Sequence, residues 1–425
     1  MSGAMLAVML ALFAAGVPVA IGIGLAAVAG IEGFTRFPLI VAAQQVYVAL
    51  DRFPLAAIPF FILAGNLMEA GGISRRLIAF AKSLVGRVQG GLPATCVLTC
   101  MIFAAISGSS VATTFAVGSL MIPALVRAGY PVGFAAALQA TAAELGVIIP
   151  PSIPMILYGV TTQVSIPELF LAGLLPGALI GGALVGTVLV WCRLKGWGKQ
   201  DAEGRLPLGT ATRQAAVALL APVLVLGGIY GGVTTPTEAS VIAVCYALVV
   251  GLLVHREIRP RDLWGIFRRS VVSSSVILFI IGCAGLFSWL LNRQGVPDAA
   301  AAWLVATFDG PAWFLLGVNL LLFLAGMFVE TSASIIVLAP ILQDAAQRLS
   351  IDGVHFGMVM VVNLALGMVT PPFGVNLFAA AQVAGISIDR MIPYLGVFIA
   401  LVLCCLMVVT YLPALSLLLP SLVFL

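Results

Sequence analysis

Charged residues are scarce in this chain of 425 residues: Asp, Glu, Lys and Arg together make up 8% of it, and there are only two histidines. A soluble globular protein has a charged fraction of about 25%, whereas 62% of this sequence is hydrophobic. The chain therefore does not belong to the soluble class. These proportions predict an all-α polytopic membrane protein, in which the lipid bilayer is the solvent of most helices.

Several chemical motifs are also missing. The sequence contains no GxxxxGK[ST] loop that would cradle phosphates, which argues against transport powered by ATP hydrolysis. It contains neither HExxH nor GxSxG, and no clustered catalytic residues. We therefore expect no enzymatic activity and no organic cofactor.

The cysteines and the net charge add little to this picture. All seven cysteines lie in apolar segments, where they are expected to be small buried hydrophobes rather than disulfide partners or metal ligands. The formal net charge is +4, but the basic residues fall in loops between apolar segments. They are expected to set membrane topology, and no nucleic-acid partner is expected.

Two short stretches organise the chain. Residues 146–152 (GVIIPPS) and 367–373 (GMVTPPF) each place a glycine and a double proline inside a segment apolar enough to span a bilayer. Proline removes a backbone donor and clashes with the preceding turn, so each helix must break there. Irregular backbone at membrane depth persists only where it lines a cavity or faces protein, and a matched pair of broken helices indicates the binding site of a transporter.

The remaining segments are arranged around these two broken helices. Residues 73–89 and 255–269 combine basic and apolar residues, which predicts two amphipathic interfacial helices. Two apolar runs interrupted near residues 107–110 and 330–332 predict re-entrant hairpins, because each arm is short against the ~20 residues needed to cross. The expected elements are spans at 4–30, 53–70, 167–191, 215–233, 236–254 and 271–291, hairpins at 93–128 and 311–349, broken spans at 131–164 and 354–383, and a final span.

The two halves of the chain resemble each other in the order of these features. The sequence numbers of Gly146 and Gly367 differ by 221, as do those of Pro150 and Pro371, whereas those of the hairpin prolines Pro123 and Pro340 differ by 217, which predicts a four-residue gap. When each span reverses direction, sixteen of the 20 basic residues fall on one side of the membrane, and Arg36, Arg52, Arg293 and Arg348 fall on the other. The first side is then cytoplasmic, and the hairpins enter from opposite sides as an inverted repeat.

This organisation predicts five segments and the location of both ends. The N-terminus is expected in the cytoplasm and the C-terminus in the periplasm. The segments are residues 1–90 (scaffold spans and an interfacial arm helix), 91–192 (first repeat of a transport element), 193–214 (a cytoplasmic loop), 215–292 (scaffold spans and a second arm helix) and 293–425 (second repeat of the transport element).

The tips and breaks offer hydroxyl and carbonyl oxygens without fixed charge, which suits hard monovalent cations. The first predicted cation site comprises Ser107, Ser110, Gly146, Ile149 and Pro150, and the second comprises Gly326, Gly367, Thr370 and Phe373. The half-helices beyond the tips would direct N–H groups at an anionic substrate. Further candidates for substrate binding or gating are Gly108, Ser109, Pro151, Ser152, Thr331, Ser332, Pro371, Pro372 and Asn376.

Three acidic residues lie within apolar runs, where a carboxylate is a functional hypothesis because its insertion costs ~3 kcal/mol or more. Glu330, beside the second tip, is a candidate for cation coordination, proton coupling or a clamp on the hairpin, and Glu144 for a similar role. For Glu238 a helix cap is favoured. Asn66, Gln139 and Asn363 either line the pathway or bond between helices.

Four motifs, in this order, resemble one family. They are ISGSS at residues 106–110, IIPPSIP at 148–154, TPTEA at 235–239 and TPPFG at 370–374. Together they are similar to the large membrane subunit (the M subunit, DctM-like) of tripartite ATP-independent periplasmic (TRAP) transporters. The resemblance covers essentially the whole chain.

The resemblance implies an elevator-type secondary transporter, similar to the ion-transporter superfamily, in the inner membrane of a Gram-negative bacterium. Sodium would be the coupling ion for uptake of an organic anion, usually a carboxylate such as a C4-dicarboxylate or a sugar acid. A periplasmic binding protein would deliver the substrate, and a small four-helix membrane subunit would be a separate chain.

Other classes remain as alternatives to this interpretation. The nearest is a stand-alone sodium- or proton-coupled dicarboxylate symporter of similar inverted-repeat design, which would transport without a binding protein. A channel would conduct without gradient coupling. A membrane scaffold would have no need for two matched helix breaks.

Overall fold

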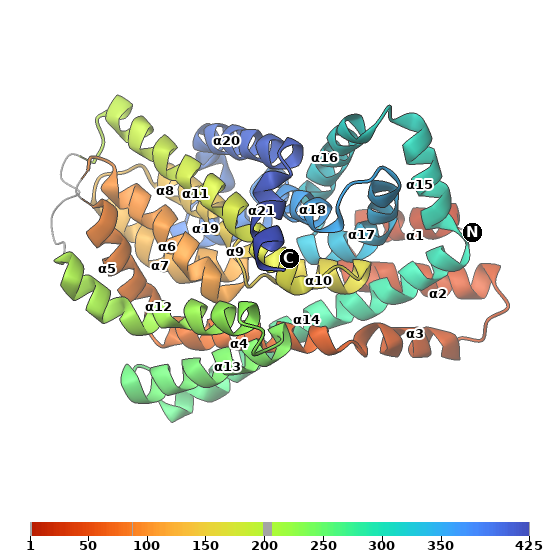
Figure 1. Ribbon diagram of the computed structural model, residues 1–425, viewed down its shortest axis with the longest axis horizontal. Coiled ribbons are helices and arrows are strands. Elements are labelled where there is room, and N and C mark those ends of the chain that lie inside the picture. The colour runs from red at the N-terminus through yellow and green to blue at the C-terminus, as the bar shows by residue number, and fades with distance from the viewer. Residues whose placement is uncertain (1, 87, 199–205, 425) are drawn as a thin grey trace.

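The structure is a computed structural model that describes residues 2–86, 88–198 and 206–424, and these residues form helices and no strands (Figure 1). Arg87 of the first interfacial segment and residues 199–205 of the predicted cytoplasmic loop lie outside the described residues. Eight of the described helices are long and apolar enough to cross a membrane, or nine if one bent pair is counted as a single span. The prediction of an all-α polytopic protein is confirmed.

The first half of the chain contains two pairs of consecutive helices that pack against each other, α1 with α2 and α6 with α7, and the first break. The bounds are α1 (Ser2–Ala14), α2 (Val19–Phe34), α3 (Ile40–Leu50), η1 (Phe53–Ala56), α4 (Ala57–Ala70), α5 (Ile73–Val85), α6 (Gly91–Ser107), α7 (Ser110–Arg127), α8 (Val132–Ala143), α9 (Leu145–Ile148), α10 (Ile153–Thr162) and α11 (Ile166–Lys195).

The second half follows a similar order. Its elements are α12 (Leu208–Tyr230), α13 (Pro236–Val249), η2 (Val250–Val254), α14 (Pro260–Arg293), α15 (Val296–Thr307), α16 (Pro311–Phe328), α17 (Thr331–Arg348), α18 (Gly353–Gly367), α19 (Val375–Ala384), η3 (Ile388–Arg390), α20 (Ile392–Tyr411) and α21 (Ala414–Val423).

Several helices of the two halves match at a constant offset in the sequence. Helix α7 and helix α17 both have 18 residues, and their first residues, Ser110 and Thr331, have the same offset as Gly146 and Gly367. The first residues of α8 and α18 share this offset too. The predicted four-residue gap is therefore wrong: Pro340 simply lies one helical turn nearer the start of its helix than Pro123 does.

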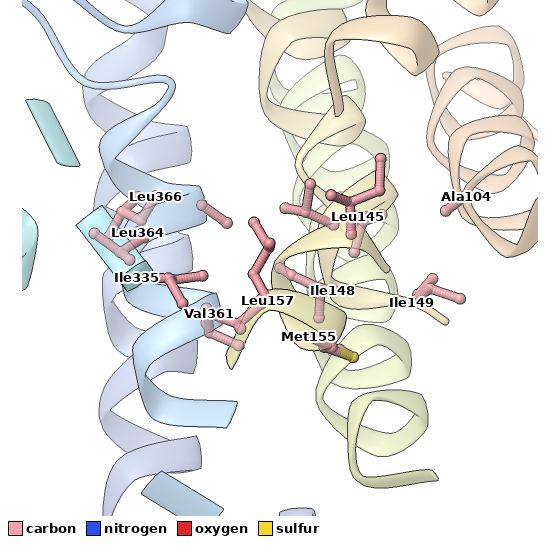
Figure 2. Packing of buried hydrophobic residues seen from close by; sticks show 14 of the residues in the cluster. Ala104, Leu145, Ile148, Ile149, Met155, Leu157, Ile335, Val361, Leu364 and Leu366 are labelled. Carbon is pink, nitrogen blue, oxygen red and sulfur yellow. The ribbon is translucent and has the colours of Figure 1, made fainter. Parts of the chain in front are cut away.

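The centre of the molecule is formed by the two broken helices. Helices α8 and α18 are apolar on all sides and buried over almost their whole length, which is typical of a helix surrounded by others. Figure 2 shows Leu145, Ile148 and Leu157, from the first broken helix, facing the apolar side chains of α18. This packed layer holds the two breaks close together.

A second group of helices lies along one side of this centre. Helix α14 packs against α2, α3, α4 and α17, and α13 packs against α4 (Figure 1). The amphipathic helix α5 packs on α6 and α12. Arg75 and Arg76 of α5 form ion pairs with Glu257, at N–O distances of 3.2 and 2.7 Å, which tie α5 to the turn before α14.

Three predicted elements differ from the structure. The predicted span 4–30 is two helices, α1 and α2, that pack against each other, because Gly16 ends the first in a left-handed conformation and Pro18 caps the second. The predicted second interfacial helix, residues 255–269, is not separate: residues 270–281 contain no glycine or proline, and α14 continues without a break to Arg293. The chain ends in α21, packed on α11, rather than in the final span.

The cysteines in this structure are free thiols. Five are buried, as predicted. Cys245 and Cys404 are exposed on the helix surface, so the burial prediction is wrong for these two.

Candidate functional site

The tip of the first hairpin rests on the first break. The backbone N–H of Ile153, at the start of α10, donates to the carbonyl of Gly108 at 3.3 Å. A Cβ atom on Gly108 would lie 2.9 Å from the Pro151 carbonyl oxygen, and one on Gly146 would lie 2.7 Å from the Ser109 carbonyl oxygen. Glycine is needed at both positions because the two backbones approach too closely for a side chain.

The double proline explains how this break exposes oxygen atoms. In a continuous helix the N–H groups of residues 150 and 151 would donate to the carbonyls of Gly146 and Val147, but both residues are prolines. The hydroxyl of Ser152 donates to Val147 at 2.6 Å and so replaces one of these bonds. Among the described residues, no donor reaches the carbonyl of Gly146.

The structure gathers only part of the first predicted cation site around this carbonyl. The hydroxyl of Ser107 lies 3.0 Å from the hydroxyl of Thr113, whose oxygen would lie 2.7 Å from a Cβ on Gly146. The prediction at Ile149 concerns its backbone carbonyl, and its side chain packs against Gly177 of α11. The hydroxyl of Ser110 donates to the sulfur of Met368, at 3.5 Å, and so points at the second break.

The second break is closed by its own backbone. The carbonyl of Gly367 accepts from the N–H of Thr370 at 3.1 Å, and that of Met368 accepts from the N–H of Asn376 at 3.0 Å. These are the carbonyls that would bond residues 371 and 372, both prolines, in a continuous helix. Both breaks contain a cis peptide bond between their two prolines.

The second predicted cation site is likewise assembled in part. Gly326 of α16 and Gly367 lie backbone to backbone, since a Cβ on Gly367 would be 2.5 Å from the Gly326 carbonyl carbon. The hydroxyl of Thr370 donates to the Leu366 carbonyl at 2.8 Å. The prediction at Phe373 concerns its backbone carbonyl. Its side chain is exposed and contacts Phe328, with ring centroids 5.9 Å apart and the rings tilted by 51°.

Glu330 caps the second hairpin's returning helix. Its carboxylate accepts from the N–H groups of Ser332 and Ala333, at 2.8 and 3.2 Å, and from the hydroxyl of Ser332 at 2.9 Å. In this conformation the carboxylate of Glu330 holds the first turn of α17, as expected of a clamp on the hairpin. Ser109 caps the first hairpin's returning helix in the same way, at the matching position of the first half.

Several buried polar atoms near the breaks have no hydrogen-bond partner among the described residues. They include both carboxylate oxygens of Glu144, both side-chain polar atoms of Asn376 and the hydroxyl of Thr331. The side chains of Glu144 and Asn376 are fully buried. Buried polar groups are normally paired, so these unpaired atoms mark the centre as a place where ions or water are needed.

A cavity of about 840 Å³ lies between the two hairpin tips and the neighbouring helices. Ser107, Ser109 and Glu330 line it from the tips, and Arg268 and Arg269 line it from α14. Among the described residues, neither arginine forms an ion pair. Glu69 lines the same cavity and interacts electrostatically with Arg269. Guanidinium groups are able to bind carboxylates.

The two arginines were not singled out in the sequence. They belonged to a basic segment that predicted an interfacial helix, and nothing local shows that α14 carries them beside the hairpin tips. Asn66, one of the amides considered for the pathway, does line the cavity, and it donates to the hydroxyl of Ser270 at 2.8 Å. Glu69 also lines it.

The remaining polar candidates have structural partners. Glu238 forms a capping box with Thr235, which confirms the predicted cap. The thiol of Cys96 donates to the side-chain carbonyl of Gln139 at 3.1 Å. The side-chain amide of Asn363 donates to the side-chain carbonyl of Asn319 at 2.8 Å, so both Gln139 and Asn363 connect helices.

Comparison with known proteins places these features in context. Residues 6–415 match the family described as tripartite ATP-independent periplasmic transporter, DctM component. The chain is 38% identical over 430 residues to the C4-dicarboxylate TRAP transporter large permease protein DctM of Rhodobacter capsulatus, covering 97% of each protein. It is 42% identical over 400 residues to the isethionate TRAP transporter permease protein DctMQ of Oleidesulfovibrio alaskensis, covering 94% of this chain but only 63% of that relative.

One solved structure has a similar fold. The YdaH transporter of Alcanivorax borkumensis superposes with a TM-score of 0.60 over 88% of each chain. Its sequence identity is 19%, so this similarity concerns the fold alone.

Proposed function

The chain belongs to the family of DctM components, the large permeases of TRAP transporters, and we propose that it takes up an organic carboxylate by coupling to sodium. The relatives are named as transporter permeases rather than enzymes. The family and the apolar helices together make it a multi-pass protein of the bacterial inner membrane.

The cavity between the tips is the observation that carries this proposal. Its walls include Ser107 and Ser109 of the first tip and Arg268 and Arg269 of α14. A C4-dicarboxylate or a sugar acid offers carboxylates for the arginines and hydroxyl or carbonyl oxygens for the tips. Substrate would therefore bind between the mobile hairpins and α14.

Sodium is proposed as the coupling ion because the first break offers oxygen ligands. The carbonyl of Gly146 has no donor among the described residues, and the hydroxyls of Ser107 and Thr113 lie beside the same glycine. Hard cations prefer such oxygens. The second proposed site uses carbonyls near Gly326 and Gly367 with Thr370, whose hydroxyl would turn from Leu366 toward the ion.

Glu144 is proposed as a further coupling group. Its carboxyl is buried near this break without a partner among the described residues, and a lone ionised carboxylate there would be strongly unfavourable. We propose that it takes up a proton or a cation during transport, in addition to sodium at the two sites.

An elevator mechanism and an inverted repeat are proposed for the movement. Their support is the constant sequence offset between matched helices of the two halves, α7 with α17 and α8 with α18. Residues 91–192 and 293–425 would move together against a scaffold formed by residues 1–90 and 215–292. The excess of basic residues on one side supports a cytoplasmic loop at residues 193–214. The predicted cytoplasmic N-terminus depended on a single span at residues 4–30, and the division of that span into α1 and α2 removes this support.

Two protein partners are proposed. A periplasmic binding protein would deliver the substrate, and a small four-helix membrane subunit would complete the scaffold as a separate chain. The isethionate relative is named DctMQ, and this chain spans only 63% of its length. The rest of that relative leaves room for a second component, which supports a small partner subunit.

The proposal is tested by uptake into proteoliposomes that contain this chain, its candidate small subunit and its binding protein. We expect uptake under an inward sodium gradient, but not under a potassium or proton gradient alone. Ser107→Ala, Thr370→Ala and Arg269→Gln should lower it, whereas Thr307→Ala, on an exposed helix face, should not.

Two outcomes would overturn parts of this assignment. Uptake without the binding protein would favour a stand-alone dicarboxylate symporter. Uptake driven by protons alone would move the coupling role from the two sodium sites to Glu144 and Glu330.

A further inference from the structure

A second cavity, of about 310 Å³, lies at the other end of α14. Its lining includes Arg52, from the segment between α3 and η1, and Asn292 near the end of α14. Two helices of the hairpin and break region, α10 and α17, form its opposite wall. The cavity thus lies between the same two groups of helices as the first one.

One face of α14 connects the two cavities. Arg269, Ser273 and Ile277 line the first cavity, and Ile281, Gly285, Ser288 and Asn292 line the second. Their spacing of three or four residues places them on a single stripe of the helix. At about 1.5 Å per residue, this stripe is about 34 Å long.

The opposite wall is formed by α10 and α17, which present successive turns to the two cavities. Ile153, the first residue of α10, lines the first cavity, while Leu157 and Thr161 line the second. Glu330, at the start of α17, lines the first, while Pro340 lines the second. If α10 moved along its axis until its first residue, Ile153, stood where Thr161 stands, the shift would be eight residues, or about 12 Å.

The chemistry of the second cavity suits an anion. Among the described residues that line it, Arg52 carries the only charge, and the polar groups around it are the amides of Gln45, Gln163 and Asn292 and the hydroxyls of Thr161 and Ser288. Arg52 forms no ion pair with any described residue. By contrast, Arg293 nearby lies over the rings of Phe37 and Trp289.

We propose that this cavity is a second binding site for the organic carboxylate, in which Arg52 binds the carboxylate group when the hairpin tips stand at this end of α14. Arg268 and Arg269 then bind it when the tips stand at the other end. The substrate would meet a guanidinium at each end of the stripe and mostly apolar side chains between them. This inference rests on the proposed function, because it assigns a residue to one position of the proposed movement.

Substrate dependence of the initial uptake rate tests this assignment in the complete reconstituted transporter. For Arg52→Gln we expect KM to rise about tenfold while the maximal rate changes by less than about twofold, and Arg52→Lys should recover part of the loss. Arg36→Gln is the matched control, because Arg36 is exposed and lines neither cavity. An unchanged KM in Arg52→Gln would overturn the inference.

A labelling experiment gives a second readout that does not depend on folding of the Arg52 variant. Ser288→Cys is introduced where the exposed Cys245 and Cys404 have been replaced by serine, and its reaction rate with a charged thiol reagent is measured with and without substrate. We expect substrate to slow the reaction, and an equal rate would contradict the site. If the wild type shows no sodium-dependent uptake, the proposed function fails; if only these two results fail, the function stands.

Discussion

The first and second breaks carry the same pattern, a glycine followed four residues later by a double proline, but they complete their hydrogen bonds differently. At the first break the hydroxyl of Ser152 donates to the released carbonyl of Val147, whereas the carbonyl of Gly146 has no donor among the described residues. At the second break the backbone N–H groups of Thr370 and Asn376 donate to the two released carbonyls. The first break therefore leaves a backbone carbonyl without a donor among the described residues, whereas the second leaves neither of its two released carbonyls unpaired.

This difference has a sequence origin. The residue after the double proline is Ser152 in the first break and Phe373 in the second. A serine side chain can reach back to the carbonyl, while a phenylalanine cannot, so the chain after the second break turns until the N–H of Asn376 reaches Met368. Similar motifs thus give breaks with different hydrogen bonding.

The largest expected effect comes from the contact that the second break makes with α16. In Gly367→Ala the new Cβ would meet Gly326 backbone atoms at 2.5 and 2.6 Å, so the helices must separate, and we expect a loss of about 3 kcal/mol of stability. In Gly146→Ala the new Cβ would meet the Ser109 carbonyl oxygen and the Thr113 hydroxyl, both at 2.7 Å. Because these contacts are longer than those at Gly367, the loss should be smaller.

Thermal unfolding of the purified variants in detergent measures this ranking. Gly186→Ala on α11 is the control, because its Cβ would have no atom within 4 Å. Equal losses in Gly367→Ala and Gly146→Ala would show that the two glycines are packed alike.

The next effect concerns the matched residues after the prolines. Ser152→Ala leaves the buried carbonyl of Val147 without its donor, which should cost about 1–3 kcal/mol. Phe373→Ala removes an exposed ring and should change stability by less than about 0.5 kcal/mol. Chemical or thermal unfolding of both variants under one condition decides this, and similar losses would contradict the proposed difference between the breaks.

The hairpin caps give a smaller effect. Glu330→Ala removes a cap with three hydrogen bonds and should cost about 1 kcal/mol. Ser109→Ala removes a cap whose one bond is 3.4 Å long and should cost less. Hydrogen exchange of the first turns of α17 and α7 reports each cap, and a larger acceleration at α7 in Ser109→Ala than at α17 in Glu330→Ala would reverse the order.

The smallest change in stability is expected at Glu144, which is matched by Ala365 in the second half. Because glutamine has nearly the size of glutamate and the carboxyl forms no hydrogen bond to a described residue, Glu144→Gln should leave stability almost unchanged and still lower uptake. Unfolding temperature and uptake are measured on the same preparation. Unchanged uptake would remove Glu144 from the proposed coupling groups.

Local sequence was sufficient for the features that depend on backbone chemistry. Glycine and proline positions predicted the breaks and tips, and Thr235 with Glu238 predicted a cap. The same signals, Gly16 and Pro18, also divide α1 from α2, but the length of the apolar run outweighed them in the prediction.

The cavities could not be predicted in this way, because they depend on distant segments. Arg269 and Ser107 are separated by more than a third of the chain, and only the packing of α14 against α4 brings them to one cavity. The continuity of α14 was missed for a related reason: a change from basic to apolar composition does not by itself end a helix.

The helical segments between cap and proline differ in length in the two hairpins, because Pro123 and Pro340 lie at different positions in their helices. Each proline removes one helical hydrogen bond and softens α7 or α17 at that turn. The stiff segment between cap and proline is about 21 Å long in the first hairpin and about 15 Å long in the second, at ~1.5 Å per residue. For the same bending angle, the first tip would swing about 1.4 times as far as the second, and the first tip is the one that rests beside the open carbonyl of Gly146.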